Sequence, residues 1–574
     1  MIGRARARLI AVARGDAAPD IVIEGAQVFC AHTREWLSGD VAVADGMVAG
    51  IGSFDGGERI DARGRRLVPG FIDAHMHVES SKLTPAQFAR AVLPHGTTAI
   101  VCDPHEVANV LGSDGVHWML DASEGLPLTV FVMAPSCVPA SAFESPRREL
   151  TVGDMEAILR RRRALGVAEM MNFPGVVAGD PDVLRKLEVR GASHADGHAP
   201  GVTGRALDAY TAAGIRSDHE ATTVEEALAK RRRGMWVLLR EASNARNLRT
   251  LLPLVREHGP DFCAFCTDDR EPDMLLREGH INQMCRIAVE EGVPAEDVLL
   301  MATLNAARAH GLDGFGAIAP GFRADLVLLD DLESFAPALV LAGGRVAARD
   351  GRAEPFDVPP TPAHVLGTVR SAPVGEGDLV LEADGAVRVI EIVPEQLITI
   401  ERTVEPARSN GHVVADPSRD LAKIAVVERH HATGRVGRGL VTGFGLRRGA
   451  FASTVAHDAH NVVAVGVDDA DILACAARLQ ELGGGIVVAS GGAVTGELAL
   501  PVAGLLSDEP VEDVVAALDA LHEQLRELGV AIEAPFMTLS FLALSVIPAL
   551  KITDRGLVDV ERFEIVPLAA GAGG

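Results

Sequence analysis

Near its start the chain reads Val68-Pro69-Gly70-Phe71-Ile72-Asp73-Ala74-His75-Met76-His77, an apolar run that ends at two histidines one residue apart. Residues i and i+2 of a strand face the same side, so both imidazoles can reach one metal ion from the end of one strand. The alternative is a pair of unrelated surface histidines near a turn. The rest of the chain favours a metal site, because it supplies further candidate ligands in an ordered series.

Apolar runs recur after this segment, with helical patterns between them, as far as about residue 315. Repeated alternation of strand and helix is typical of an α/β fold, and eight repeats predict a (β/α)8 TIM-like barrel. The fifth and sixth runs are weak and leave a doubly wound open sheet as the alternative. The runs are 67–72, 98–102, 128–133, 167–171, 192–194, 215–216, 235–239 and 262–266.

We assign the predicted barrel to residues 67–315. The segments on either side of it have different sequence patterns. Residues 1–66 and 316–365 alternate short apolar runs with glycines, a pattern typical of hairpins. We expect these two pieces to form one small β-sandwich domain beside the barrel. Residues 366–574 are expected to form a C-terminal α+β domain with an amphipathic helix near 511–528.

Composition limits the class of protein. The chain has 574 residues, which is too long for one compact domain, and a net charge of −25, which disfavours nucleic acid as a partner. Seven scattered cysteines and the lack of a signal peptide predict a reducing, cytoplasmic location. The apolar stretch 535–550 is shorter than the roughly 20 residues of a spanning helix, so we interpret it as buried core and expect no membrane partner. The tail 569–574 is expected to be disordered.

Candidate metal ligands follow the apolar runs, where a barrel gathers the carboxyl ends of its strands. Imidazole and carboxylate together suit zinc, iron or manganese. Six ligands are more than one ion with an open position needs, so we predict a two-metal site bridged by Glu169. Asp269 is the alternative to Asp268, since a strand pleat would point only one of them inward. The predicted set is His75, His77, Glu169, His198, His219 and Asp268.

Several segments resemble the amidohydrolase superfamily, and bacterial adenine deaminases within it. The motif Pro69 to His77 is generic to the superfamily, whereas the combination of the other segments is specific to adenine deaminases. The resemblance covers nearly the whole chain. Its segments are 77–81, 102–106, 171–175, 196–201, 217–220, 266–272, 316–326, 443–445 and 456–461.

The resemblance implies hydrolysis of adenine to hypoxanthine and ammonia by a metal-activated hydroxide, as in purine salvage. It implies two divalent ions, usually manganese or iron, with zinc as an alternative, on the six positions given above. Adenine is then the small-molecule partner, and a homodimer or larger homo-oligomer is expected by analogy.

The end of the fourth strand distinguishes an adenine deaminase from superfamily members that hydrolyse cyclic amides. Many superfamily hydrolases of cyclic amides bridge their metals with a carboxylated lysine there. Lys82 and Lys186 are the only lysines between His77 and His198, and neither follows the fourth run, whose end carries Glu169 instead. The alternatives are another amidohydrolase that acts on a cyclic amide or a different aminated heterocycle, and a non-catalytic relative.

Three of the predicted ligands are also the predicted catalytic residues. They are Asp268, His219 and Glu169. Asp268 would accept a proton from the attacking water and return it to the leaving amine, because it lies within reach as a ligand. His219 would orient and polarise the attacked group. Attack at C6 also requires a proton on ring N1, for which Glu79, Glu106, Glu220 and Glu271 are the candidates.

Further residues near the predicted strand ends have open roles. Asp103 and His105 end the second strand with Glu106 and are expected to contact the purine or to support ligands. Trp236 and Arg240 either line the pocket or pack in the barrel wall. The third unit holds His457, Asp458 and His460, which would cap the site, bind another metal or stabilise a turn. Cys263 and Cys266 have an odd offset, so they cannot both point inward and are expected to pack.

Overall fold

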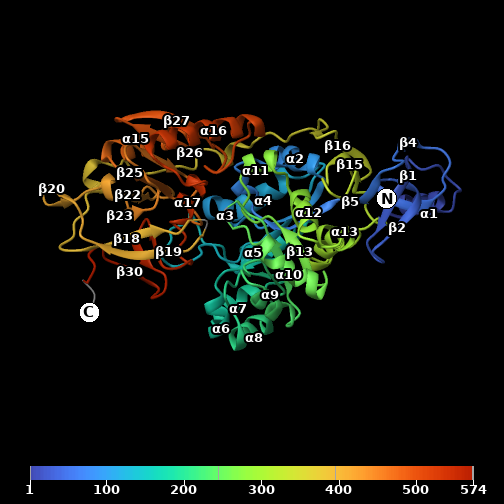
Figure 1. Ribbon diagram of the computed structural model, residues 1–574, viewed down its shortest axis with the longest axis horizontal. Coiled ribbons are helices and arrows are strands. Elements are labelled where there is room, and N and C mark those ends of the chain that lie inside the picture. The colour runs from blue at the N-terminus through green and yellow to red at the C-terminus, as the bar shows by residue number, and fades with distance from the viewer. Residues whose placement is uncertain (1, 244, 395, 572–574) are drawn as a thin grey trace.

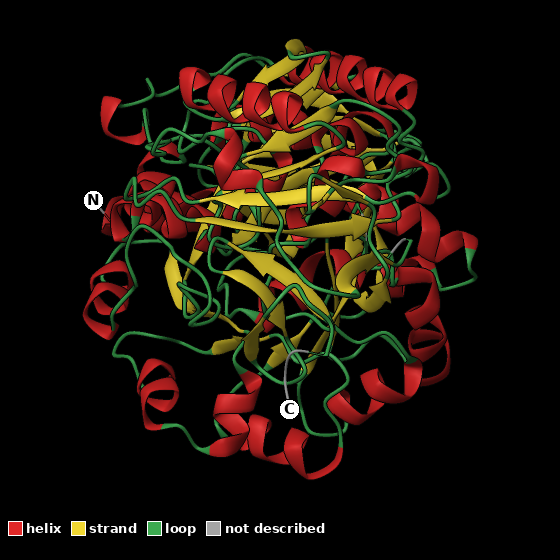
Figure 2. Cartoon of the chain, turned by 90° about the vertical axis from the view of Figure 1, so that its left-hand side faces the viewer, coloured by secondary structure: helices red, strands yellow, loops and turns green. Residues whose placement is uncertain are grey.

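The computed structural model describes residues 2–243, 245–394 and 396–571. Figure 1 shows three parts along the long axis of the molecule: the sheet next to the N-terminus, the central strands and helices, and the C-terminal unit at the other end. Seen from the C-terminal side in Figure 2, strands occupy the interior and helices lie around the periphery.

The central part is the predicted barrel. Two parallel sheets, in the orders β10-β9-β8-β7-β6 and β11-β12-β13, are joined by the parallel bridges Met76↔Asp268 and Ala195↔Ile215. The ring is therefore closed, and the doubly wound open sheet is excluded. The strands are β6 (Phe71–Met76), β7 (Thr97–Cys102), β8 (Thr129–Ala134), β9 (Ala164–Met170), β10 (Ala195–Gly197), β11 (Ser217–Asp218), β12 (Trp236–Arg240) and β13 (Cys263–Cys266).

Three of the predicted runs are corrected in position. The weak runs 192–194 and 215–216 lie just before β10 and β11. The run 67–72 is divided at Gly70 between β5 (Arg66–Pro69), which belongs to the small sheet, and β6 of the barrel. A Cβ on Gly70 would lie 2.1 Å from Thr98 Oγ1, so only glycine allows the chain to pass this closely from one sheet to the other.

Helices follow the barrel strands and cover them. Residues inside the ring, such as Ala264 and Cys266, form a core of their own, whereas Cys263 and Phe265 belong to the core between strands and helices. This confirms that the two cysteines pack on opposite sides. The helices include α2 (Pro85–Val92), α3 (His105–Leu111), α4 (Ser113–Ala122), α5 (Val152–Leu159), α6 (Phe173–Ala178), α7 (Pro181–Leu187), α8 (Gly204–Ala212), α9 (Val224–Arg231), α10 (Leu248–His258), α11 (Pro272–Arg277), α12 (Ile281–Glu290), α13 (Ala295–Leu300) and α14 (Ala306–Ala309).

The two flanking pieces pair with each other, as expected, and their strands form one sheet. β14 pairs antiparallel with β5, with Val327 opposite Val68, so segments on either side of the barrel in sequence share one core. An additional helix, α1 (Ile2–Ala13), was not predicted and packs against β2 and β3. The remaining strands are β1 (Ile21–Cys30), β2 (Glu35–Ala44), β3 (Met47–Gly52), β4 (Glu58–Asp61), β14 (Leu326–Leu329), β15 (Pro337–Ala342), β16 (Arg345–Arg349) and β17 (Arg352–Ala353).

The C-terminal unit is built on a mixed sheet in the order β19-β18-β23-β22-β25-β24-β26-β27. The predicted amphipathic helix is confirmed as α16, whose buried face includes Val514, Leu518, Leu521 and Leu525. The elements are β18 (Val387–Ile392), β19 (Thr399–Val404), β20 (Arg408–Ser409), β21 (His412–Val413), β22 (Ala422–Val427), β23 (Val436–Thr442), β24 (Ala450–Ser453), β25 (Val462–Gly466), α15 (Asp469–Leu482), β26 (Gly485–Ser490), β27 (Ala493–Ala499), α16 (Val511–Leu528), α17 (Pro535–Phe541), β28 (Leu550–Thr553), β29 (Gly556–Asp559) and β30 (Glu564–Val566).

The tail is ordered where the structure describes it. Ala569 bridges Val387, and the Ala570 N–H donates to the Ala386 carbonyl at 2.8 Å. The prediction of disorder is therefore wrong for these two residues, and residues 572–574 lie outside the described part of the chain.

The C-terminal unit is held against the barrel. The Ser507 N–H donates to the Lys82 carbonyl at 2.8 Å, and the Ser545 N–H donates to Glu144 Oε1 at 3.2 Å. Arg277 Nη2 donates to Asp519 Oδ1 of α16 at 2.6 Å. Among the described residues, no helix combines the length and apolar character needed to cross a membrane.

Candidate metal centre and substrate pocket

The six predicted ligands converge at the carboxyl ends of the barrel strands. His75 lies on β6 and His77 directly follows it, while Glu169 lies near the end of β9. His198 and His219 follow the short strands β10 and β11. Five of the six are buried and His198 is partly buried, so side chains that are distant in sequence share one water-poor site.

Glu169 lies at the centre of this site. Its Oε1 atom lies 3.4 Å from His77 Nε2 and 4.0 Å from His75 Nε2. Its Oε2 atom lies 2.7 Å from His198 Nδ1 and 3.4 Å from His219 Nε2. The two oxygens therefore face two different pairs of histidines, which is the arrangement that a bridging carboxylate requires.

Asp268 completes the site beside the first pair of histidines. Its Oδ1 atom lies 3.1 Å from His77 Nε2 and 3.6 Å from His75 Nε2, and its Oδ2 atom accepts a hydrogen bond from Arg240 Nη1 at 2.8 Å. Asp268 lies beyond β13 with a φ of 56°, so the strand pleat does not choose between it and Asp269. Asp269 instead accepts a hydrogen bond from Ser80.

The donors fit divalent metal ions. His75 Nε2 is buried and has no hydrogen-bond partner among the described residues. His77 Nδ1 lies 2.9 Å from the Asp103 carbonyl and therefore carries the proton, which leaves the Nε2 lone pair for a metal. Donor atoms of His75, His77 and Asp268, and of His75, Glu169 and His219, lie within 4.8 Å of one another.

The electrostatics of the site favour cations. Burial by itself would raise the pKa of Asp268, but His219, His75, His77 and Arg240 hold it well below its usual range. The pKa of Glu169 is also lowered, because His198, His219 and His75 outweigh the effect of burial. Burial opposes the charged form of His219, but Asp268, Glu220 and Glu169 raise its pKa to about 9. The carboxylates thus remain ionised and attract positive charge.

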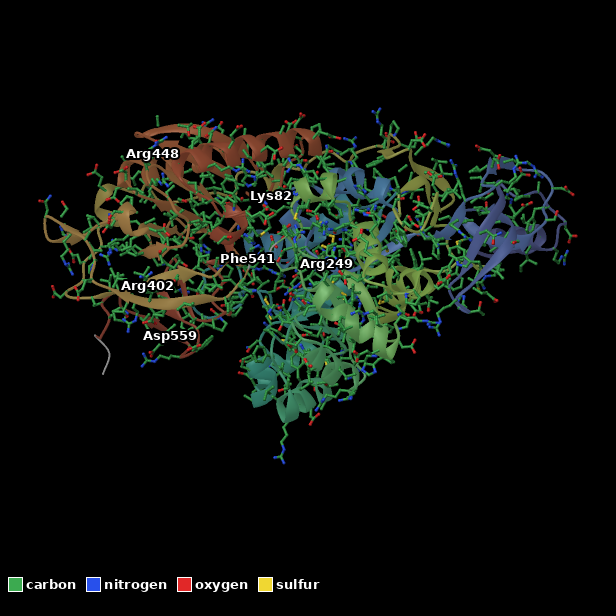
Figure 3. All side chains as sticks on the ribbon, in the orientation of Figure 1. Lys82, Arg249, Arg402, Arg448, Phe541 and Asp559 are labelled. Atoms are coloured by element: carbon green, nitrogen blue, oxygen red, sulfur yellow. The ribbon has the colours of Figure 1, made fainter. Side chains whose placement is uncertain are left out.

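A pocket opens beside this cluster, between the barrel and the C-terminal unit. Most of its polar lining comes from the barrel, whereas the C-terminal unit supplies most of its apolar lining together with His457 and Asp458, near the position where Figure 3 labels Phe541. The lining residues are His77, His105, Glu106, Glu169, Met171, His198, His219, Glu220, Arg240, Asp268, Asp269, Leu397, His457, Asp458, Phe541, Leu544 and Ile547.

The apolar wall was not predicted from the sequence. Phe541, Leu544 and Ile547 come from the stretch that we interpreted as buried core, and Leu397 comes from the loop before β19. No sequence signal distinguishes such residues, because an apolar side chain that faces a pocket has the same pattern as one in a core.

The residues at the end of the second strand divide between two layers. His105 and Glu106 line the pocket, and His105 Nδ1 lies 3.6 Å from Glu169 Oε1. Asp103 lies behind them, with Oδ2 3.1 Å from His105 Nδ1. Asp103 therefore orients His105, which fits the supporting role among the two that the sequence left open. Arg240 lines the pocket, whereas Trp236 packs with the residues inside the barrel and with Phe262.

Two candidates for substrate contact are corrected. The pocket lining formed by described residues does not include Glu79 or Glu271. The 3₁₀ turn η1 (Val78–Ser81) directs Glu79 toward α3, where Oε1 accepts from the Val107 N–H at 3.1 Å. Burial, together with the charge of Glu106, raises the pKa of Glu79 to about 8. Glu271 Oε1 instead pairs with Lys82 Nζ at 2.7 Å.

We expect Lys82→Met to destabilise the fold, because it leaves the buried Glu271 carboxylate without its partner. Lys82 is 2% and Glu271 5% exposed, and loss of one member of a buried pair costs about 3–5 kcal/mol. The measurement is the thermal midpoint. Arg402→Met, at a surface pair with 53% side-chain exposure, is the control and should change little. Both positions are labelled in Figure 3. Equal midpoints for the two variants would contradict the assignment.

His457 and Asp458 of the C-terminal unit line the pocket and cap it. The His457 ring stacks on Phe541 at 4.4 Å between centroids, and Asp458 Oδ1 lies 3.6 Å from His105 Nε2. His460 Nδ1 accepts from the Ala456 N–H at 3.0 Å, so a neutral ring carries its proton on Nε2, which faces Glu106 Oε2 at 3.7 Å. Neither of these two atoms has a hydrogen-bond partner among the described residues, and a nitrogen that carries a proton has no lone pair for a metal.

Comparisons with known proteins agree with this architecture. The model of the amidohydrolase family matches residues 66–347, and that of the adenine deaminase C-terminal domain matches residues 396–564. An adenine deaminase from Desulfatibacillum aliphaticivorans is 46% identical over 98% of this chain and 99% of its own length. One from Cereibacter sphaeroides is 48% identical over 98% of this chain and 100% of its own length. Similarity of this extent along both proteins shows that the chain belongs to the adenine deaminase family of amidohydrolases.

Proposed function

We propose that this protein hydrolyses adenine to hypoxanthine and ammonia, in the service of purine salvage. One observation carries the proposal: the cluster of histidines and carboxylates opens into a pocket whose other wall comes from the unit that matches the adenine deaminase C-terminal domain. A homo-oligomer in the cytoplasm, with adenine as the small-molecule partner, is part of the same proposal.

The proposed cofactor is a pair of divalent ions, manganese or iron, with zinc as an alternative. His75, His77 and Asp268 would hold one ion, His198 and His219 the other, and Glu169 would bridge them. When bound, such ions act as Lewis acids and lower the pKa of a water molecule from 15.7 to about 7. The distribution of histidines around the two oxygens of Glu169 supports two ions over one.

Asp268 and His219 carry the proposed chemistry on the protein side. The water oxygen forms a bond to C6, the C6–N6 bond breaks, and N6 leaves as ammonia. Asp268 accepts one proton of the water and passes it to N6, and Arg240 at Oδ2 keeps Oδ1 turned toward the site. The second water proton leaves the oxygen as C6 becomes a carbonyl, and it restores the proton that the donor to N1 gave up. His219, stacked on His75 at 4.2 Å, orients the attacked group.

Glu106 is the proposed donor of the proton to N1. Glu79 and Glu271 lie outside the described pocket lining, and the pKa of Glu220 is held well below its usual range, because Arg240, His198 and His219 outweigh burial. Glu106 lines the pocket, and burial raises its pKa, so it is the pocket glutamate that retains a proton most readily.

Phe541→Ala should raise the KM for adenine about 10-fold with a smaller change in kcat, since contact of a base with an aromatic ring contributes about 1–3 kcal/mol. The measurement is a steady-state titration with adenine at constant metal content. Phe563→Ala, at a ring that is 56% exposed, is the matched control. If Phe541→Ala had a wild-type KM, the apolar wall would not be part of the adenine-binding site.

The experiment that tests the function is product analysis on purified, metal-loaded protein. Adenine should disappear as hypoxanthine and ammonia appear in equal amounts. A panel of cyclic amides and other aminated heterocycles tests the alternatives in parallel. Turnover of a panel member without turnover of adenine would overturn the proposal.

A further inference from the structure

Lys551 is a buried lysine in the C-terminal unit that the chemistry of the metal centre does not use. It lies on β28 and has no exposed surface. Its Nζ donates to the carbonyl oxygen of Leu397 at 2.8 Å and to that of Phe541 at 3.1 Å. Both acceptors belong to residues whose side chains line the substrate pocket.

Of the two carbonyl groups, only that of Leu397 depends on Lys551 alone among the described residues. Phe541 is the last residue of α17, where carbonyls lose their partners within the helix, and its carbonyl also accepts from the Leu544 N–H at 3.3 Å. Leu397 lies in the loop between β18 and β19, outside any strand, so its carbonyl has no ladder partner. A buried carbonyl without a hydrogen bond is unfavourable, so Lys551 satisfies the Leu397 carbonyl and adds a second, shorter hydrogen bond to the Phe541 carbonyl.

The backbone around Lys551 ties the same two segments together. The Ile552 N–H donates to the Leu542 carbonyl at 3.0 Å, and the Ala549 N–H donates to the Thr399 carbonyl at 3.1 Å. Thr399 Oγ1 donates to the Leu550 carbonyl at 2.8 Å. The strand that carries Lys551 is thus fixed between the loop and the helix end, and the lysine adds the contacts nearest to the pocket wall.

We propose that Lys551 is a positioning residue for the proposed reaction, because it holds Leu397 and Phe541 in the wall against which the purine packs. It touches neither the substrate nor the metal ligands, and it acts through the backbone of these two residues. This inference rests on the function proposed above. Burial lowers the pKa of Lys551 to about 7, in keeping with a group enclosed by the segments that it joins.

The test compares Lys551→Met with Lys551→Arg and with a matched control, Lys423→Met. Lys423 is a buried lysine of the same unit that donates to the Leu379 carbonyl at 3.2 Å and pairs with Asp469, away from the pocket. Lys551→Met should raise the KM for adenine about 10-fold, with kcat and metal content close to wild type. Lys551→Arg, which keeps the donors, should restore most of the affinity. Lys423→Met should leave the KM unchanged.

Two further measurements separate positioning from a general loss of structure. In a double-mutant cycle, Lys551→Met should raise the KM of Phe541→Ala by less than it raises the wild-type KM, because part of its effect acts through Phe541 and only the rest through Leu397. Hydrogen exchange in peptides that cover 396–399 and 538–542 should become faster in Lys551→Met and not in Lys423→Met. If Lys551→Met does not fold, Lys551→Gln, which keeps one amide donor, takes its place.

The inference is overturned if Lys551→Met keeps both a wild-type KM and wild-type exchange, or if Lys423→Met raises the KM equally. Hydrogen exchange needs no substrate, so its result is independent of the proposed function. If the wild-type protein does not deaminate adenine, the proposed function fails, and the exchange data alone decide whether Lys551 holds the wall.

Discussion

Asp268→Asn should reduce kcat for adenine by about 10²–10⁴-fold, the range expected when a positioned proton-transfer group is lost. The amide oxygen can still face His77 and His75, at 3.1 and 3.6 Å in the wild-type structure, so the metal content should remain close to wild type. An amide cannot accept the proton of the attacking water and return it to N6. Turnover measured together with metal analysis checks both expectations.

Asp269→Asn is the matched control, because it makes the same chemical change one residue away. Asp269 accepts a hydrogen bond from Ser80 and is not among the proposed metal ligands. We expect its effect on kcat to be much smaller than that of Asp268→Asn. If the two effects were reversed, Asp269 would be the proton-transfer group and the assignment of Asp268 would be wrong.

Removal of divalent ions by a chelator should abolish turnover to the level of a protein-free control. The carboxylates of Glu169 and Asp268 are held ionised at the centre of the site, so the protein cannot supply the missing Lewis acid from its own side chains. Addition of manganese, iron or zinc in separate samples should restore activity to different degrees. Full turnover of protein shown to be free of metal would contradict a metal-dependent mechanism.

Single variants test the number of ions. His198→Ala removes a proposed ligand from one side of Glu169, so we expect roughly half of the wild-type metal content. His105→Ala is the control, because His105 lines the same pocket at 3.6 Å from Glu169 but is held by Asp103 and is not a proposed ligand. Equal metal loss in both variants would argue against separate ion sites.

Local sequence pattern was a good guide wherever the chain is regular. Alternation along β13 correctly placed Cys263 and Cys266 on opposite sides, and the ends of the apolar runs marked the positions of His77, Glu169 and His219. These predictions hold because backbone geometry in a strand fixes the direction of each side chain, and a barrel brings the carboxyl ends of its strands to one mouth.

The same reasoning failed where the chain leaves regular structure. Asp268 lies past the end of β13 with a positive φ, so the pleat no longer determines its direction. Glu271 and Glu79 are also close to strand ends in sequence, yet a turn and a buried lysine direct them away from the pocket. A periodic pattern contains no information on backbone angles outside the strand.

The spacing of the apolar runs was thus sufficient for the barrel, since it depends on local geometry repeated along the polymer, whereas the family was recognised from the resemblance of its motifs. The proposed ligand set follows from the ends of the same runs. The pocket wall formed by Leu397, Phe541, Leu544 and Ile547 emerged only from the packing of the C-terminal unit on the barrel, and the link from Lys551 to two of these residues emerged only from the packing within that unit. Contacts between segments more than one hundred residues apart depend on how whole units dock, and that information lies in the complementarity of folded surfaces.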